Sequence, residues 1–381
     1  MAELFVCGDP RFLSGGKGAR STNYGNAPRG VESLSGAAFC TGTIPACGSA
    51  PVESHSANSG QTVHFGKTGY HHTPSYNSFL HDGEWPSAGI ELETHLRQFD
   101  NEFAAAAESD LHSNWFHFER DGSLDRAHSG AFGYELITEP LPPRAYRDQR
   151  LWTGLQNLCA PWLQSFGCEE TGLHVHVGLN QFEGFNAIPL PYKTDRRAIG
   201  KMLSAVVYYC VVDQAFIDRV ALRKPTGYCG QAEEYGFVGA AGEVAAGRAT
   251  GAWLVDYCVS TLMRRRGRYV QDVQNVDVAS RAVQAETLCE PVWIGNTVFA
   301  CGHGTEINQE HSYTVEFRRA KGTLHALSVH RIVELMTSIV RFAGKICREP
   351  DFTVTRDSFM DWLIQTTTSE ALRNLAKQTK G

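Results

Sequence analysis

The clearest alternation of apolar and polar positions in the chain lies in the seven residues 172–178, Gly-Leu-His-Val-His-Val-Gly. Successive side chains of a strand point to opposite faces, so the leucine and the two valines predict a packed face while His174 and His176 share the other face. Neutral imidazole is a common metal ligand, and a His-x-His pair can direct two nitrogens into one small volume. The alternative is a half-buried strand that carries histidines without a ligand.

Three further segments show the same alternation with carboxylates on the polar face. Period-two patterns of this kind predict strands with one face packed and the other available for polar side chains. The segments are Gly89–Glu93 with Glu91 and Glu93, Gly133–Thr138 with Glu135, and Tyr313–Arg319 with Glu316 and Arg318.

Helical periodicity appears in four segments after about residue 140. We expect one helix from about Asp148 to Phe166 with a kink at Pro161, and a core helix, apolar nearly all round, from about Asp195 to Arg219. A third should run from about Ala326 to Ile346, with a last helical region near 357–378. The glycine- and alanine-rich residues 228–250 predict a loop or lid, and Trp115–Asp125 predicts a strand, a turn and a strand.

Residues 1–85 differ from the rest because they are rich in glycine and serine, lack sustained helical periodicity and still contain interleaved aromatics. A free linker has little use for these aromatics. We therefore expect an extended N-terminal arm that packs on its own catalytic domain, on a neighbouring subunit or on a partner. Residues 86–381 would form the catalytic domain.

Composition excludes several classes of protein. The 381 residues carry a formal net charge of -6 with a pI near 6.2, which argues against a general nucleic-acid binder. The longest strongly apolar run, Leu203–Val212, is too short to span a membrane, and no secretory signal pattern is visible. The 11 cysteines include no Cys-x-x-Cys pair, which fits neither a disulfide framework nor a cysteine zinc site and suits a reducing cytoplasm.

Several carboxylates and imidazoles on strand faces predict a shared metal site, because such carboxylates repel one another without cations. An excess of oxygen over nitrogen ligands favours Mg²⁺ or Mn²⁺ over structural zinc. Arg318 beside such a metal suggests a phosphoryl-transfer site, since metal and guanidinium together neutralise charge on phosphoryl oxygens. The alternative is a structural Glu316–Arg318 pair on a solvated face, although Arg319 and Lys321 add further positive charge beside it.

Five motifs in order resemble the amidoligases of the glutamine synthetase and glutamate-cysteine ligase superfamily. The resemblance covers about residues 86–347 and leaves the arm outside. The motifs are Gly-x-Glu-x-Glu at 89–93, Asp-Gly-Ser at 121–123, a strand glutamate followed by Pro-Leu at 135–141, Gly-Leu-His-Val-His-Val-Gly at 172–178, and Thr-Val-Glu-Phe-Arg-Arg with Gly-Thr-Leu at 314–324.

This resemblance implies an α+β fold with a glutamine synthetase-like curved antiparallel sheet that forms a cleft and is backed by helices. It implies ATP and two or more Mg²⁺ (or Mn²⁺) ions as cofactors. The positions that match metal ligands are Glu91, Glu93, Glu135, His174 and Glu316.

The resemblance also assigns residues to the nucleotide and to the chemistry. His176 matches a position near the nucleotide phosphates, and Arg318 matches the arginine that faces the transferred phosphoryl group. Arg223 is a weaker candidate for a phosphate or substrate carboxylate, and Arg319 joins the expected nucleotide-binding residues. Asp121 matches the family's turn, where its role is catalytic or purely structural, and Glu139 stands where the family has proline and is an extra ligand candidate.

The expected function is ATP-dependent carboxylate–amine ligation through an acyl phosphate, with catalytic roles for Glu316, Arg318 and Asp121. Its partners would be a small-molecule or protein carboxylate and an amine, without nucleic acid or membrane, and the arm could mediate homo-oligomer or partner contacts. One rival is a metal-dependent hydrolase built on the His-x-His pair, which gives no reason for Arg318. Another is a retired ligase fold that serves as a structural or interaction protein.

Overall fold

The computed structural model describes residues 85–96, 116–120, 124, 133–161, 163–166, 171–182, 196–224, 237–261, 306–308 and 313–380. These residues fall into two compact units. The first contains described residues from 88–174 and 320–330, and the second those from 85–87, 175–319 and 331–380. The predicted arm lies outside the described part of the chain except for Trp85, and so does Asp121.

The first unit is built on antiparallel strand pairs. β3 pairs with both β1 and β2, and β4 pairs with β1. Leu92, Leu136 and Phe118 lie opposite one another and are buried, which defines a packed face. The strands are β1 (Ala88–Leu96), β2 (Phe116–Arg120), β3 (Gly133–Thr138) and β4 (Leu163–Gln164).

Two helices, α2 (Pro143–Tyr146) and α3 (Gln149–Cys159), follow β3. Asp148 caps α3 by accepting a hydrogen bond from the backbone N–H of Arg150. The prediction of one kinked helix as far as Phe166 was wrong, because α3 ends two residues before Pro161 and the chain then forms β4. Proline disfavours helical conformation in the residue before it, and the pairing of β4 with β1 uses the backbone groups of 163–164.

The core helix predicted from Asp195 to Arg219 is divided into α4 (Arg196–Val206), the π-helix η9 (Val207–Val211) and α5 (Gln214–Ala221). Val212 is extended, and Asp213 starts α5 by accepting a hydrogen bond from the N–H of Ala215. The other described elements between β4 and the C-terminal helices, in chain order, are β5 (Gly172–Gly178), η8 (Asn180–Phe182), α6 (Val238–Ala245), residues 251–261 in helical conformation, β6 (Ile307–Asn308) and β7 (Thr314–Lys321).

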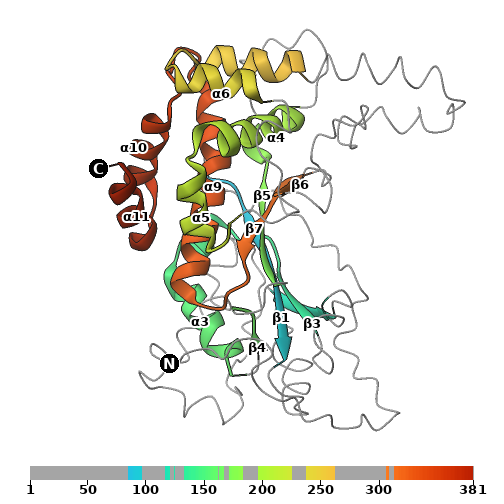
Figure 1. Cartoon of the computed structure of the whole chain (residues 1–381). Coiled ribbons are helices and arrows are strands. Elements are labelled where there is room, and N and C mark those ends of the chain that lie inside the picture. The colour runs from blue at the N-terminus through green and yellow to red at the C-terminus, as the bar shows by residue number, and fades with distance from the viewer. Residues whose placement is uncertain are drawn as a thin grey trace, which may run out of the picture. The chain divides into compact units, whose positions relative to one another are not determined.

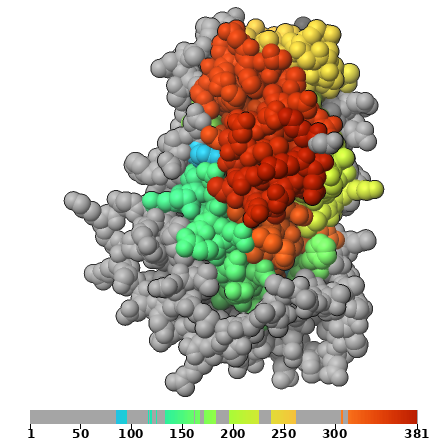
Figure 2. All heavy atoms as spheres, turned by 90° about the vertical axis from the view of Figure 1, so that its left-hand side faces the viewer, coloured from blue at the N-terminus to red at the C-terminus, as the bar shows by residue number. Residues whose placement is uncertain are grey.

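The C-terminal part is helical. α9 (Ala326–Arg348) is followed by α10 (Arg356–Thr366) and α11 (Glu370–Lys380), which lie side by side (Figure 1). Figure 2 shows the atoms of this C-terminal segment, coloured orange to red, gathered in one patch. Phe342 of α9 packs edge-on against Phe359 and Trp362 of α10. The last predicted helical region is thus two helices, separated at 367–369.

The described strands are joined by hydrogen bonds in the order β2-β3-β1-β5-β7-β6, with β4 on β1. Helices together with antiparallel strand pairs confirm the predicted α+β class. The bounds predicted for β3 and β5 are also confirmed. No helix in the described ranges is long and apolar enough to cross a membrane.

Candidate functional site

The strand β5 places its two histidines as the alternation predicts. Leu173, Val175 and Val177 are fully buried on one face, and His174 and His176 lie on the other. Glycines bound the strand at both ends. A Cβ on Gly172 would lie 3.1 Å from Glu93 Oε2 and 3.1 Å from His174 Nε2, so the glycine leaves room for both polar groups.

His174 lies between two carboxylates of β1. Its Nδ1 is 3.4 Å from Glu91 Oε2, and its Nε2 is 3.6 Å from Glu93 Oε1. Glu93 Oε2 accepts a hydrogen bond from the backbone N–H of Gly172 at 2.5 Å. Because its two nitrogens face different carboxylates, His174 is placed to orient Glu91 and Glu93 relative to β5.

Glu119, Glu135 and Glu93 form a row of carboxylates across β2, β3 and β1, hereafter the carboxylate row. Glu135 lies directly opposite Glu93 on one side and Glu119 on the other. Directly opposite residues have Cβ atoms about 4.5 to 5.5 Å apart, and like charges at that separation are destabilising. Glu119 is only 4% exposed, so solvent screens its charge little. A cation bound at this row would lessen the repulsion between the carboxylates.

Sequence reasoning missed Glu119 although a signal was present. Phe116-His117-Phe118-Glu119 alternates apolar and polar residues, as the other site strands do. These residues belong to the predicted strand–turn–strand motif, whose Asp-Gly-Ser turn at 121–123 carries the stronger motif. That turn lies outside the described residues.

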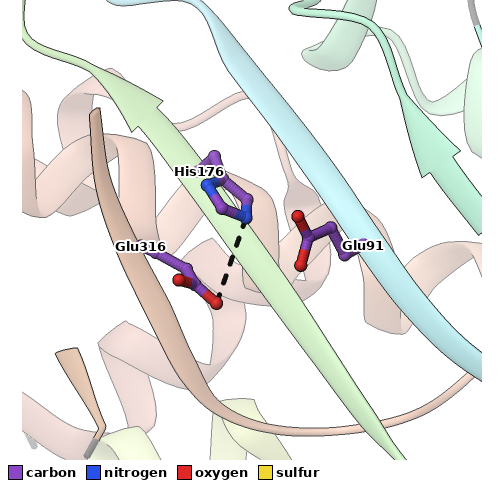
Figure 3. Close-up of side chains that lie close together, drawn as sticks. All are labelled: Glu91, His176 and Glu316. Atoms are coloured by element: carbon purple, nitrogen blue, oxygen red, sulfur yellow. Dashed lines mark ion pairs between the residues drawn. The ribbon is translucent and has the colours of Figure 1, made fainter. Parts of the chain in front are cut away.

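Glu316 on β7 faces both a histidine and an arginine. Arg318 Nη1 donates to Glu316 Oε1 at 2.5 Å, and His176 Nε2 lies 4.0 Å from the same oxygen (Figure 3). Glu316 is 1% exposed, so its carboxylate needs a compensating positive charge or hydrogen bonds nearby. Glu316 and Arg318 share one face of the strand, as the alternation predicts. They form the ion pair of the alternative interpretation, but the carboxylate is buried and not on a solvated face.

Within the described residues, Glu91, His176 and Glu316 form the one group of three potential metal ligands, with one ligand atom of each within 4.8 Å of the others. Two carboxylates and one imidazole suit Mg²⁺ or Mn²⁺. This group contains His176, whereas the family resemblance assigned the metal to His174. Glu93 and Glu135 are in the carboxylate row instead.

Arg319 is placed differently from the expectation. It shares its side of β7 with Val315 and Phe317, and Phe317 packs against Tyr208 of η9 with ring centroids 5.7 Å apart. Its guanidinium is 1% exposed and donates to Gln214 at 2.7 Å, to Glu306 at 3.2 Å and to Asp218. This buried network ties β7 to α5, so we do not retain Arg319 among the nucleotide-binding residues.

The buried network has an electrostatic cost. Burial raises the pKa of Glu306 above its ordinary value although the charge of Arg319 opposes the shift. Burial also raises the pKa of Tyr208, which adjoins Glu306 and Arg319, well above its ordinary value. The network therefore holds one guanidinium with several acidic partners in a water-poor place, which fixes the position of β7.

Two weaker candidates lie at the ends of elements. Arg223 is half-buried and follows Leu222, which ends α5 in the left-handed conformation with φ of 59°. Glu139 is half-buried and directly follows β3. Within the described residues, the group of potential metal ligands does not include Glu139.

Comparison with known proteins leaves the family open. No protein-family model matches the chain, and no curated protein matches it. Function must therefore be argued from the residues on these strands.

Proposed function

We propose that the chain is an ATP-dependent carboxylate–amine ligase with a glutamine synthetase-like arrangement of its sheet. The observation that supports this most is the convergence on Glu316 of an arginine at 2.5 Å and an imidazole at 4.0 Å. A buried carboxylate beside an imidazole and a guanidinium can hold a divalent cation next to a second positive charge, and phosphoryl transfer uses both to neutralise the phosphoryl oxygens. A hydrolytic metal site would need the imidazole and the carboxylate but not the arginine.

The donor set fits a divalent cation. His176 Nε2 and Glu316 Oε1 are 4.0 Å apart. Mg²⁺ binds its ligands at about 2.0 to 2.1 Å, so two ligand atoms at this separation are close enough to share one ion. In the proposal Glu91, His176 and Glu316 hold the cation, which when bound neutralises charge on the phosphate oxygens of ATP. In the carboxylate row, like charges also lie directly opposite one another, and a bound cation would lessen their repulsion.

In this proposal, residues of the chain bind the phosphoryl group and orient the metal-binding side chains. Arg318 supplies a planar guanidinium for the oxygens of the transferred phosphoryl group. His174 orients Glu91 and Glu93, and the buried Arg319 network fixes the strand that carries Glu316 and Arg318. Catalysis would come mainly from positioning and charge neutralisation.

The proposed reaction has two steps. An oxygen of the substrate carboxylate attacks the γ-phosphorus of ATP, the bond to the β-phosphate oxygen breaks, and ADP leaves. The nitrogen of the amine then attacks the acyl carbon, loses a proton and displaces inorganic phosphate, which leaves an amide or isopeptide bond.

The test is untargeted mass spectrometry of products. Purified full-length protein is incubated with ATP, Mg²⁺ and pools of carboxylic acids and amines, with Glu316→Gln as the matched control. We expect ADP, phosphate and a new mass equal to acid plus amine minus water, all absent with the variant. AMP release would point to an adenylating enzyme, and cleavage without ATP to the metal-dependent hydrolase. If no pool leads to ATP consumption, the result would favour a ligase fold that has lost its activity and serves as a structural or interaction protein.

A further inference from the structure

One oxygen of Glu316 has two potential cationic partners. Oε1 accepts the hydrogen bond from Arg318 Nη1 at 2.5 Å and is also the atom that lies 4.0 Å from His176 Nε2. A cation coordinated between His176 and Glu316 would bind this same oxygen. The guanidinium and such a cation would therefore contact the same atom.

Charge balance at Glu316 favours one positive partner at a time, either the guanidinium of Arg318 or a divalent cation. Glu316 is 1% exposed, and a buried carboxylate is costly without a positive partner. Arg318 supplies that partner in the metal-free protein. A divalent cation on Oε1 takes over the role and repels the guanidinium, since two positive charges a few ångströms apart at low dielectric are strongly unfavourable.

We propose that Arg318 and a divalent cation compete for Oε1 of Glu316, so that metal binding releases the guanidinium. Coupling between two ligands of one group is reciprocal: Arg318 weakens metal binding, and metal weakens the Arg318–Glu316 pair by the same factor. The idea that the released Arg318 then binds a phosphoryl group rests on the proposed function. The competition between Arg318 and the cation for Glu316 does not. In that function the cation must bind before Arg318 can engage the nucleotide.

The first experiment measures Mn²⁺ affinity without any substrate, from the electron paramagnetic resonance signal of free Mn²⁺. We expect Arg318→Met to bind Mn²⁺ about tenfold more tightly than wild type, which corresponds to about 1.4 kcal/mol. Glu316→Gln should bind more weakly. Lys321→Met is the matched control, because it removes one positive charge from the same strand on its other face, and its affinity should change by less than about threefold.

Two outcomes would overturn the competition. In one, Arg318→Met binds Mn²⁺ no more tightly than wild type. In the other, Lys321→Met strengthens binding as much as Arg318→Met, which would show a general charge effect and no contest for one oxygen. Failure to find ligase products would leave this result unchanged, so the two proposals fail separately.

A second experiment needs only wild-type protein. Phenylglyoxal modifies accessible guanidinium groups, and peptide mass spectrometry measures the rate at each arginine. We expect Mn²⁺ to speed the modification of Arg318 severalfold, while Arg248, an exposed arginine paired with Glu243, serves as the reference in the same digest and keeps its rate. A rate at Arg318 that Mn²⁺ leaves unchanged or lowers would contradict the release of the guanidinium.

Discussion

At the scale of single residues, burial decides which charged groups are costly and therefore informative. Glu119 and Glu316 are almost fully buried, whereas Glu91 and Glu93 are partly exposed. Glu316 has Arg318 within hydrogen-bond distance, while Glu119 lies directly opposite another carboxylate. Burial therefore makes the charges of Glu119 and Glu316 more consequential for stability than those of Glu91 and Glu93.

Replacing Glu119 with glutamine should stabilise the metal-free protein. The change keeps the shape of the side chain and removes one negative charge from the carboxylate row, so the free energy of unfolding should rise by about 0.2 to 1 kcal/mol. Thermal unfolding in the presence of a chelator measures this. Glu139→Gln is the control, because Glu139 lies beyond the end of β3, and its melting temperature should stay near that of wild type. A lower melting temperature for Glu119→Gln would mean that its carboxylate is stabilised by hydrogen bonds that glutamine loses.

The raised pKa of Glu306 predicts a pH dependence with a definite sign. Burial makes the folded protein hold this proton more readily than the unfolded chain, whose carboxyl has its ordinary pKa of 4.5. The contribution of Glu306 to stability therefore decreases as pH rises from about 4.5 through its folded pKa. Glu306→Gln cannot titrate, so the stability of wild type relative to this variant should fall with rising pH. A relative stability that rises over this interval would contradict the burial argument.

At the scale of elements, a single side chain caps the start of α5, the last segment of the predicted core helix. Asp213 caps α5 through the N–H of Ala215 and also forms an ion pair with Arg356 at the start of α10. Asp213→Ala should lower the free energy of unfolding by about 0.5 to 2 kcal/mol, the usual cost of a lost cap. Urea denaturation measures the change. Asp256→Ala, at an exposed helical position, should stay within about 0.5 kcal/mol of wild type.

The strands could be predicted closely and the helix ends could not, for one physical reason. A period-two pattern depends on the strand's own residues, and the bounds of β3 and β5 followed from it. Helix ends here depend on groups far away in sequence. Glu334 of α9 accepts hydrogen bonds from Thr367 and Thr368 and so holds the break between α10 and α11, and no local periodicity reports that contact.

The candidate site shows the same limit. Alternation placed His174, His176, Glu316 and Arg318 on polar faces, and the structure agrees. It could not say which histidine adjoins Glu316, because that depends on the register between strands. The opposition of Glu119 and Glu135 also depends on register, and two partners of Arg319, Gln214 and Asp218, lie about one hundred residues away in sequence.

At the scale of the whole molecule, Trp85 is the described end of the predicted arm. Its ring lies 4.0 Å from the guanidinium carbon of Arg341, and the ring of Trp362 lies 5.0 Å from the same atom. Arg341 on α9 is thus held between two indole rings, one of them on α10. Cation–π contacts of this kind contribute about 0.5 to 2 kcal/mol each. The chain is therefore anchored to the C-terminal helices immediately before β1.

Two truncated proteins separate this anchor from the rest of the arm. Deleting residues 1–84 keeps Trp85, and we expect it to favour aggregation or loss of assembly, because the aromatics of the arm are predicted to cover apolar surface. Light scattering after size-exclusion chromatography measures size and aggregation. The same truncation with Trp85→Ala should have a lower melting temperature than the truncation alone, because one ring over Arg341 is lost. A truncated protein that stays soluble, keeps its size and keeps its Mn²⁺ affinity would show that residues 1–84 are dispensable, while equal melting temperatures for the two truncated proteins would show that Trp85 is no anchor.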